Sequence, residues 1–137
     1  MLLSARINRC NYKVIEMRKY YLQFKHRNAL ETWSAVTIGF DAFTQQYTYE
    51  FKADVSKAYG SNMIQVDNAP VRYAFFSGDV NQDETIDATD LSLIDNDAIN
   101  FVGGYVSTDL TGDSFVDATD YSIADNNAYN FVSLIRP

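Results

Sequence analysis

Acidic and amide side chains recur at alternate positions of one loop, in a pattern that can bind a hard cation. Loop positions 1, 3, 5, 9 and 12 carry Asp79, Asn81, Asp83, Asp87 and Asp90. Alternate residues of a tightly turning loop can direct their oxygens toward one point, and the main-chain carbonyl of Thr85 at position 7 adds another. An all-oxygen set of about six to eight ligands suits Ca²⁺ better than Mg²⁺ or a transition metal. We therefore predict a calcium site in this loop.

The same pattern occurs a second time along the chain. Residues 79–102 and 109–132 align without gaps at an offset of 30, with 13 of 24 positions identical. The second set of candidate ligands comprises Asp109, Thr111, Asp113, the carbonyl of Phe115, Asp117 and Asp120. A merely solvated acidic surface would not keep one spacing twice, so the repeat predicts two Ca²⁺ ions. Ile86 and Val116, at position 8 of each loop, are expected to pair the two loops as a short antiparallel strand.

An amphipathic helix is predicted after each loop, because the apolar residues there follow a helical period. One apolar stripe contains Leu91, Ile94, Ala98, Phe101 and Val102, and the other contains Tyr121, Ala124, Ala128, Phe131 and Val132. We expect the first helix to end at Gly103 and Gly104, since glycine readily adopts the left-handed conformation that ends a helix. The apolar segment before each loop is too short for an entering helix.

The first 77 residues have the character of a small antiparallel β-region. Strands are predicted over 20–26 and 47–52, where aromatic and polar residues alternate, and over 35–39. Residues 63–66 and 71–76 flank a turn signal and predict a hairpin, and residues 54–59 predict one helical turn that stops at Gly60. No linker separates this region from the first loop. We therefore predict an α+β fold with two parts, 1–77 and 78–137, that share one core.

Charge and composition exclude several classes of function. The chain of 137 residues is 47% hydrophobic and has a net charge of −7, divided into +4 over residues 1–72 and −11 over residues 73–137. This balance argues against a nucleic-acid-binding protein. A single cysteine and a single histidine exclude a cysteine- or histidine-based zinc site. No apolar run approaches the ~20 residues of a membrane span, and no secretory signal is recognised.

The duplicated unit resembles the tandem calcium repeats of dockerin type I modules. It shares with them the lack of an entering helix, Asp rather than Glu at position 12, and the opening motif of residues 78–83. The resemblance covers residues 78–132. It implies two Ca²⁺ ions, two antiparallel helices and a nearly two-fold symmetric surface that docks onto a β-sandwich partner, a cohesin. The positions that select the partner in that family correspond here to Ala88, Thr89, Asp95, Asn96, Ala118, Thr119, Asp125 and Asn126.

Three loop residues differ from the dockerin pattern. Position 6 usually carries glycine, and here it carries Glu84 and Ser114, each of which costs roughly 1 kcal/mol in a left-handed turn. Thr111 replaces the usual Asp or Asn at position 3 of the second loop and removes one carboxylate or amide oxygen. We therefore expect loop 1 to bind Ca²⁺ more tightly than loop 2.

A second resemblance concerns the order of short motifs along the chain. Residues 25–28, 31–34, 58–61 and 78–79 follow one another as in the C-terminal regions of large secreted bacterial surface proteins, to which they are similar. This implies a terminal module of an exported protein, located outside the cell or on its surface, although the chain shows no signal peptide.

The sequence offers no catalytic group outside the calcium pattern. His26 is expected to be structural or exposed, and a carboxylate bound to Ca²⁺ is a poor general acid. We therefore predict a non-catalytic module for protein–protein attachment. One alternative is a calcium-stabilised cap on the chain's own sheet, which would bury Ala88 and Thr89 or their counterparts in the second repeat. The other is a carbohydrate-binding module that uses Trp33 and the tyrosines.

Overall fold

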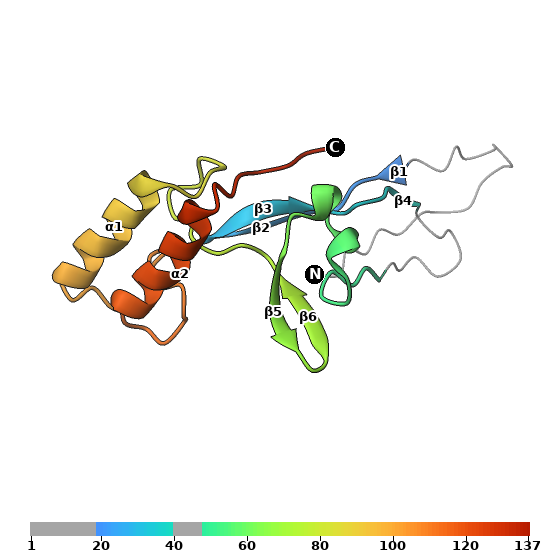
Figure 1. The fold of residues 1–137 in the computed structure, drawn as a ribbon. Helices are drawn as coiled ribbons and strands as arrows, with labels where there is room; N and C mark the ends of the chain where they lie inside the picture. The colour runs from blue at the N-terminus through green and yellow to red at the C-terminus, as the bar shows by residue number, and fades with distance from the viewer. Residues whose placement is uncertain (1–18, 40–47) are drawn as a thin grey trace, which may run out of the picture.

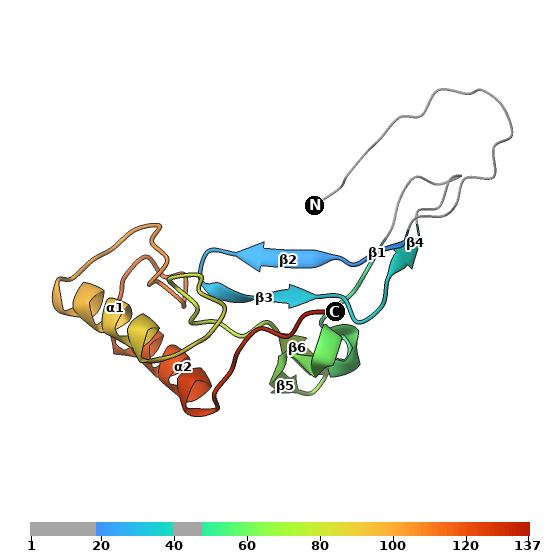
Figure 2. The same ribbon diagram turned by 90° about the horizontal axis from the view of Figure 1, so that it is seen from above.

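A computed structural model describes residues 19–39 and 48–137 of the chain (Figure 1). In these ranges, two α-helices lie side by side at one end of the molecule, and short antiparallel strands lie away from them (Figures 1 and 2). The combination of antiparallel strands with a loop–helix region confirms the predicted α+β class. Within the described ranges, neither helix has the length and apolar character needed to cross a membrane.

The described strands form two-stranded ladders rather than the single sheet that we expected. β2 (Gln23–His26) pairs with β3 (Ala29–Trp33), β5 (Ile64–Asn68) pairs with β6 (Val71–Ala74), and β1 (Lys19–Tyr20) pairs with β4 (Ile38–Gly39). The hairpin predicted around the Asp67–Pro70 turn is confirmed as β5–β6. The sequence did not indicate β3, because four of its five residues are buried and the strand therefore lacks an alternating pattern.

The strand predicted over 47–52 is wrong where the structure describes it. Tyr47 lies outside the described residues, and residues 48–52 form no strand. Their aromatic side chains pack together instead. The ring of Phe51 lies 4.8 Å from that of Tyr49 and 5.1 Å from that of Phe75, which also contacts Phe24 at 4.4 Å. The alternation in this segment therefore reflects aromatic packing and not a ladder.

The helical turn predicted over 54–59 corresponds to two short 3₁₀ turns. The first, η1 (Val55–Lys57), begins at Asp54, whose side chain accepts a hydrogen bond from the N–H of Ser56 at 2.8 Å. The second is η2 (Tyr59–Ser61), and the expected stop residue Gly60 lies inside it with φ 63°. The sequence thus located the turn but placed its end too early.

Both helices begin with residues that also belong to the predicted loops. α1 spans Ala88–Ile99 and α2 spans Ala118–Tyr129. Asp87 accepts a hydrogen bond from the N–H of Thr89 at 2.7 Å, and Asp90 accepts one from the N–H of Asp87 at 3.1 Å. The same capping box starts α2. Loop positions 9 and 12 therefore fix where each helix starts.

The helix ends differ from the prediction, because phenylalanine rather than glycine takes the left-handed position. α1 ends at Ile99, and Phe101 follows it with φ 52°; Phe131 follows α2 with φ 54°. In each repeat, main-chain hydrogen bonds of 3.0–3.3 Å close the last turn in the Schellman pattern. The predicted stop at Gly103–Gly104 is therefore wrong. The side chains of Phe101 and Phe131 are 93% and 90% exposed, so they leave the buried stripe that we predicted.

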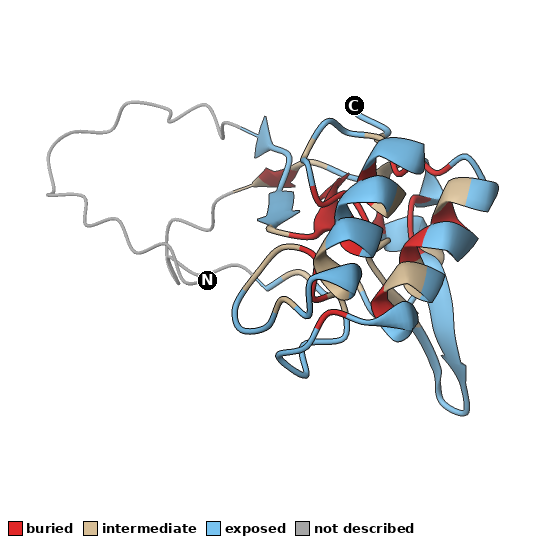
Figure 3. Cartoon of the chain, turned by 90° about the vertical axis from the view of Figure 1, so that its left-hand side faces the viewer, coloured by how far each residue is buried: buried red, intermediate tan, exposed pale blue. Residues whose placement is uncertain are grey.

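Among the residues that the structure describes, two apolar clusters form the core, and one of them joins the β-region to the repeat. The first cluster lies between the helices and comprises Val80, Ile94, Val116 and Ala124. The second comprises Leu30 of β3, Ile86 of the first loop and Val132 after α2. Figure 3 shows buried residues along the inner faces of the helices. Because Leu30 packs against Ile86 and Val132, the β-region and the repeat share this core.

Candidate metal centre

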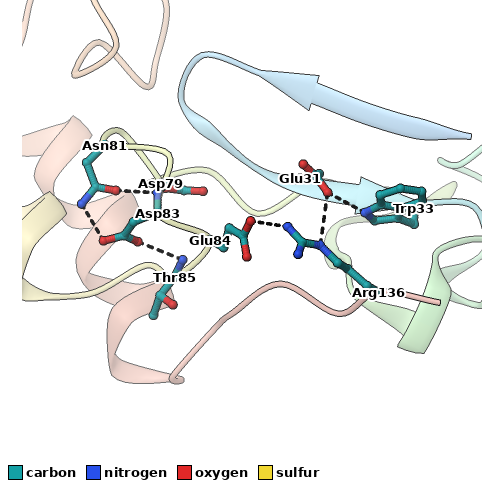
Figure 4. A network of polar contacts seen from close by, with 8 residues as sticks. All are labelled: Glu31, Trp33, Asp79, Asn81, Asp83, Glu84, Thr85 and Arg136. Carbon is teal, nitrogen blue, oxygen red and sulfur yellow. Dashed lines mark hydrogen bonds and ion pairs between the residues drawn. The ribbon is translucent and has the colours of Figure 1, made fainter.

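Three carboxylates of the first loop converge on one point. Oxygen atoms of Asp79, Asp83 and Asp90 all lie within 4.8 Å of one another. Asp79 and Asp90 are buried, with 2% and 0% exposure, whereas Asp83 is exposed. Figure 4 shows Asp79 and Asp83 next to each other in the turning loop. Like charges repel at this separation, so the arrangement favours a divalent cation between them.

The main chain holds the last ligand position in place. Oδ1 of Asp90 accepts hydrogen bonds from the N–H groups of Val80 and Asn81, at 2.9 and 3.2 Å. Its Oδ2 accepts from the N–H of Asp87 at 3.1 Å. One side chain at the start of α1 therefore closes the loop back to its own beginning. Position 12 is fixed by α1, and positions 1 and 5 are brought to it by the turn.

The remaining predicted ligands of loop 1 are distributed unevenly around this cluster. Asn81 is beside it, since its Oδ1 accepts from the N–H of Asp83 at 2.9 Å and its Nδ2 donates to Oδ2 of Asp83 at 2.8 Å. Thr85 follows, and its N–H donates to Oδ1 of Asp83 at 3.1 Å. Asp87 is outside the three-carboxylate group, because its carboxylate caps α1. The structure thus brings positions 1, 5 and 12 together and leaves position 9 apart.

Main-chain N–H groups hold the carboxylates of Asp109 and Asp120 in loop 2. Oδ1 of Asp109 accepts from the N–H of Gly112 at 2.7 Å, and Oδ2 accepts from the N–H of Ser114 at 3.1 Å. Asp120 repeats the role of Asp90, accepting from the N–H groups at 110 and 111 at 2.8 and 2.9 Å. In the part of the chain that the structure describes, only loop 1 brings three carboxylates within 4.8 Å. This difference favours the expected order of affinity, which stays a prediction.

The other predicted ligands of loop 2 keep the local turn geometry of loop 1. Thr111 Oγ1 donates to Oδ1 of Asp109 at 3.4 Å, and Asp113 accepts from the N–H of Phe115 at 2.9 Å. Asp117 caps α2, as Asp87 caps α1. The repeat in the sequence is therefore also a repeat in backbone geometry, while the carboxylates differ between the two loops.

Burial and charge crowding raise the proton affinity of the first loop. Burial is the main cause that raises the pKa of Asp79 to about 6, and the neighbouring carboxylates of Asp90 and Asp83 raise it further. Burial also raises the pKa of Asp90, against the three N–H groups that lower it. The ionised forms are therefore unfavourable without a cation. An all-oxygen donor set of this kind fits Ca²⁺.

Both loops contain a left-handed residue at position 6, where the sequence predicted it, and a second one at position 4. Glu84 and Ser114 at position 6 have φ 80° and 73°. At position 4, Gln82 has φ 61°, and Gly112 has φ 79° in the second loop. Gln82 donates from Nε2 to the main-chain carbonyl of Asp79 at 2.6 Å. The loop turns sharply twice, and in loop 1 a side chain supports the first turn.

The two loops do not pair with each other, which corrects the role predicted for Ile86 and Val116. The N–H of Ile86 donates to the carbonyl of Val132 at 3.0 Å, and the N–H of Val116 donates to the carbonyl of Val102 at 3.1 Å. Each loop thus pairs with the segment that leaves the other helix. The reason is that the helices are antiparallel, which places each loop beside the end of the opposite helix.

The residues predicted to face a partner are all in solvent. All eight are exposed, and Figure 3 shows that much of the surface of the helix pair is exposed. The exposed set contains Ala88, Thr89, Asp95 and Asn96 on α1, and Ala118, Thr119, Asp125 and Asn126 on α2. The capping alternative needed at least one of the two Ala–Thr pairs to be buried, and neither is. The shared core uses the opposite side of the helices.

The loop–helix unit is duplicated, three carboxylates converge in its first loop, and position 12 of each loop lies in the first turn of the following helix. Residues 77–127 match the family model of the dockerin type I domain. Dockerin domains are non-catalytic calcium-binding modules that attach to cohesin partners. No curated protein and no solved structure matches the chain. The family match covers most of the acidic repeat and leaves residues 1–76 outside it.

Several residues of the β-region contact the acidic loops, and the sequence did not indicate them. Asn28, at the β2–β3 turn, is 5% exposed. Its carbonyl accepts from the N–H of Gly78 at 2.8 Å, and its Nδ2 donates to the carbonyl of Asp109 at 2.8 Å. One residue thus joins the starts of both loops, through its main-chain carbonyl and its side-chain amide. A contact between residues 81 positions apart leaves no local pattern, so the sequence could not predict the role of Asn28.

Proposed function

We propose that this chain is a calcium-dependent attachment module that binds two Ca²⁺ ions and docks through α1 and α2 onto a cohesin-like β-sandwich. The observation that carries the proposal is the convergence of Asp79, Asp83 and Asp90 in a loop whose spacing recurs 30 residues later. The ion removes the repulsion among these carboxylates and thereby contributes to folding. We propose that no residue of the chain has a catalytic role.

The docking surface that we propose is the exposed side of the helix pair. It carries Asp95 and Asp125, and residues 73–135 contain no lysine or arginine. Because charge complementarity sets the rate and specificity of association, we expect a partner whose facing surface is basic or amide-rich. The same Ala–Thr and Asp–Asn pairs occur in both repeats, so either helix presents nearly the same groups.

The first test is a calcium titration of metal-stripped protein by calorimetry, followed by binding to a panel of type I cohesin domains with Ca²⁺ and with EDTA. Two binding sites for Ca²⁺ and a calcium-dependent complex are expected. The double variant Ala88→Asp with Ala118→Asp adds charge at exposed helix-start positions and should abolish docking while leaving calcium binding intact. Calcium binding without any complex would refute the docking part and favour a structural role.

A carbohydrate-binding role is the second candidate, and one observation favours it. Residues 49–52 and 73–75 line a hollow of about 360 Å³ in which Tyr49, Phe51, Tyr73 and Phe75 are the aromatic side chains. Trp33 itself is half-buried and donates its indole N–H to Glu31 at 2.6 Å, which leaves it poorly placed for stacking. Retention on immobilised polysaccharides, with Phe51→Ala as the variant, tests this candidate.

A further inference from the structure

A chain of polar contacts leads from the first calcium loop to the single tryptophan. Glu84, at position 6 of the loop, forms an ion pair with the guanidinium of Arg136. Nε of Arg136 lies 3.7 Å from Oε1 of Glu31, and the same oxygen accepts the indole N–H of Trp33 at 2.6 Å. Figure 4 shows Arg136 between the two carboxylates. Glu31 is 6% exposed, so its charge is stabilised by partners in the protein rather than by water.

The segment that carries Arg136 also holds the main chain of the loop. The N–H of Leu134 donates to the carbonyl of Glu84 at 2.9 Å, and the N–H of Ile86 donates to the carbonyl of Val132 at 3.0 Å. These two hydrogen bonds enclose Thr85, whose carbonyl is the predicted ligand at position 7. The orientation of that peptide group is therefore set by the segment that ends at Arg136.

The second loop lacks the equivalent ion pair, although its main chain is held in the same way. The N–H of Gly104 donates to the carbonyl of Ser114 at 2.9 Å. Position 6 is a serine there, and the residue that corresponds to Arg136 at the offset of 30 is Val106. Neither side chain carries a charge. The two repeats therefore differ at this contact, and only loop 1 is connected to Glu31 and Trp33 through it.

We propose that Arg136 is a positioning residue for calcium binding in loop 1, and that through Glu31 it connects the occupancy of this loop to the surroundings of Trp33. The argument rests on the proposed calcium binding of loop 1. Glu84 adopts a left-handed conformation that a side chain disfavours, and its ion pair with Arg136 holds it there. A shift of the loop on binding Ca²⁺ moves Glu84, and Arg136 transmits this movement to Glu31.

The decisive test is Arg136→Gln, because a positioning role and a simple charge effect predict opposite changes in the calcium affinity of loop 1. Removing a cation near a calcium site strengthens Ca²⁺ binding through Coulomb's law alone. Positioning predicts the reverse, with loop 1 weakened by up to about fivefold, the most expected for an exposed ion pair. Loop 2 should keep its affinity. Calorimetry separates the two sites, and tryptophan fluorescence reports Trp33 alone, since the chain has one tryptophan.

Wild-type protein should show a change in Trp33 emission that follows the occupancy of loop 1, and Arg136→Gln should reduce this change. Arg136→Lys retains the charge and should restore part of the affinity. Glu84→Gln removes the ion pair from the other side and should also reduce the change in Trp33 emission. That emission is its readout, because the loss of a carboxylate weakens Ca²⁺ binding by charge alone. Arg72→Gln on β6 makes the same chemical change outside the network and should behave as wild type.

The outcomes separate this proposal from the function on which it rests. Wild-type protein that binds no Ca²⁺ would overturn the calcium sites and this proposal together. Normal calcium binding with an unchanged or tighter loop 1 in Arg136→Gln would overturn this proposal alone. Equal weakening by Arg72→Gln would also overturn it, because the effect would then not depend on the contact with Glu84.

Discussion

Replacing Asp79 by asparagine should stabilise the protein without Ca²⁺ and destabilise it with Ca²⁺. Without the ion, burial and the carboxylates of Asp90 and Asp83 raise the pKa of Asp79 to about 6. Against an unfolded pKa of about 3.9, and at about 1.4 kcal/mol per pKa unit, the ionised group costs the folded state about 3 kcal/mol at neutral pH. An amide keeps an oxygen for the N–H of Asp83 and carries no charge, so Asp79→Asn removes most of this cost.

The assay is urea unfolding followed by far-ultraviolet circular dichroism, in EDTA and in saturating Ca²⁺. In EDTA, Asp79→Asn should have more helix or a higher free energy of unfolding than wild type, by up to about 3 kcal/mol. In Ca²⁺ it should be less stable, because it lacks the carboxylate at position 1. The matched control is Asp109→Asn in loop 2, outside the three-carboxylate group. No gain in EDTA, or an equal gain from the control, would refute the argument from charge crowding.

Three further predictions concern pH, the shared core and the residues that end the helices. Because the folded pKa of Asp79 exceeds its unfolded value, metal-free protein should lose stability as pH rises from about 4 to about 6. Over the same range the affinity for Ca²⁺, measured by calorimetry, should increase because the competing proton leaves. Leu30→Ala should lower the free energy of unfolding by about 2–5 kcal/mol, measured in urea, since Leu30 is 1% exposed within the shared core. Phe101→Gly should raise the melting temperature slightly, because glycine removes the strain of a left-handed backbone and the lost side chain is 93% exposed. Phe131→Gly should do the same. A lower melting temperature in either variant would show that the phenylalanine stabilises the folded state.

Local spacing predicted the parts of the molecule whose contacts are local. Asp79, Asp83 and Asp90 lie within 12 residues of one another, and a single turning loop is enough to bring them together. The capping boxes are also local, so the helix starts could be read from the same residues. The left-handed conformation at Glu84 followed from its position in the loop.

The features that the sequence did not predict depend on contacts between distant segments. β3 escaped prediction because it is buried on both faces, which removes the alternation that marks a half-buried strand. Phe101 was assigned to the buried stripe from its spacing, but the helix ends two residues earlier and turns the ring into solvent. The link from Arg136 to Glu31 spans more than a hundred residues and has no sequence pattern. Tertiary packing decided each of these features.

The exchange of segments between the two repeats makes each half incomplete without the other. Loop 1 is closed by residues 132–134 and loop 2 by residues 102–104, so each half borrows its closing segment from its neighbour. A solitary unit of this kind would satisfy those main-chain groups only against a second molecule, as a domain-swapped dimer. Joining two units in one chain replaces that encounter by an intramolecular one at high effective concentration. The main-chain contacts that close the two loops are therefore expected to form together when the chain folds.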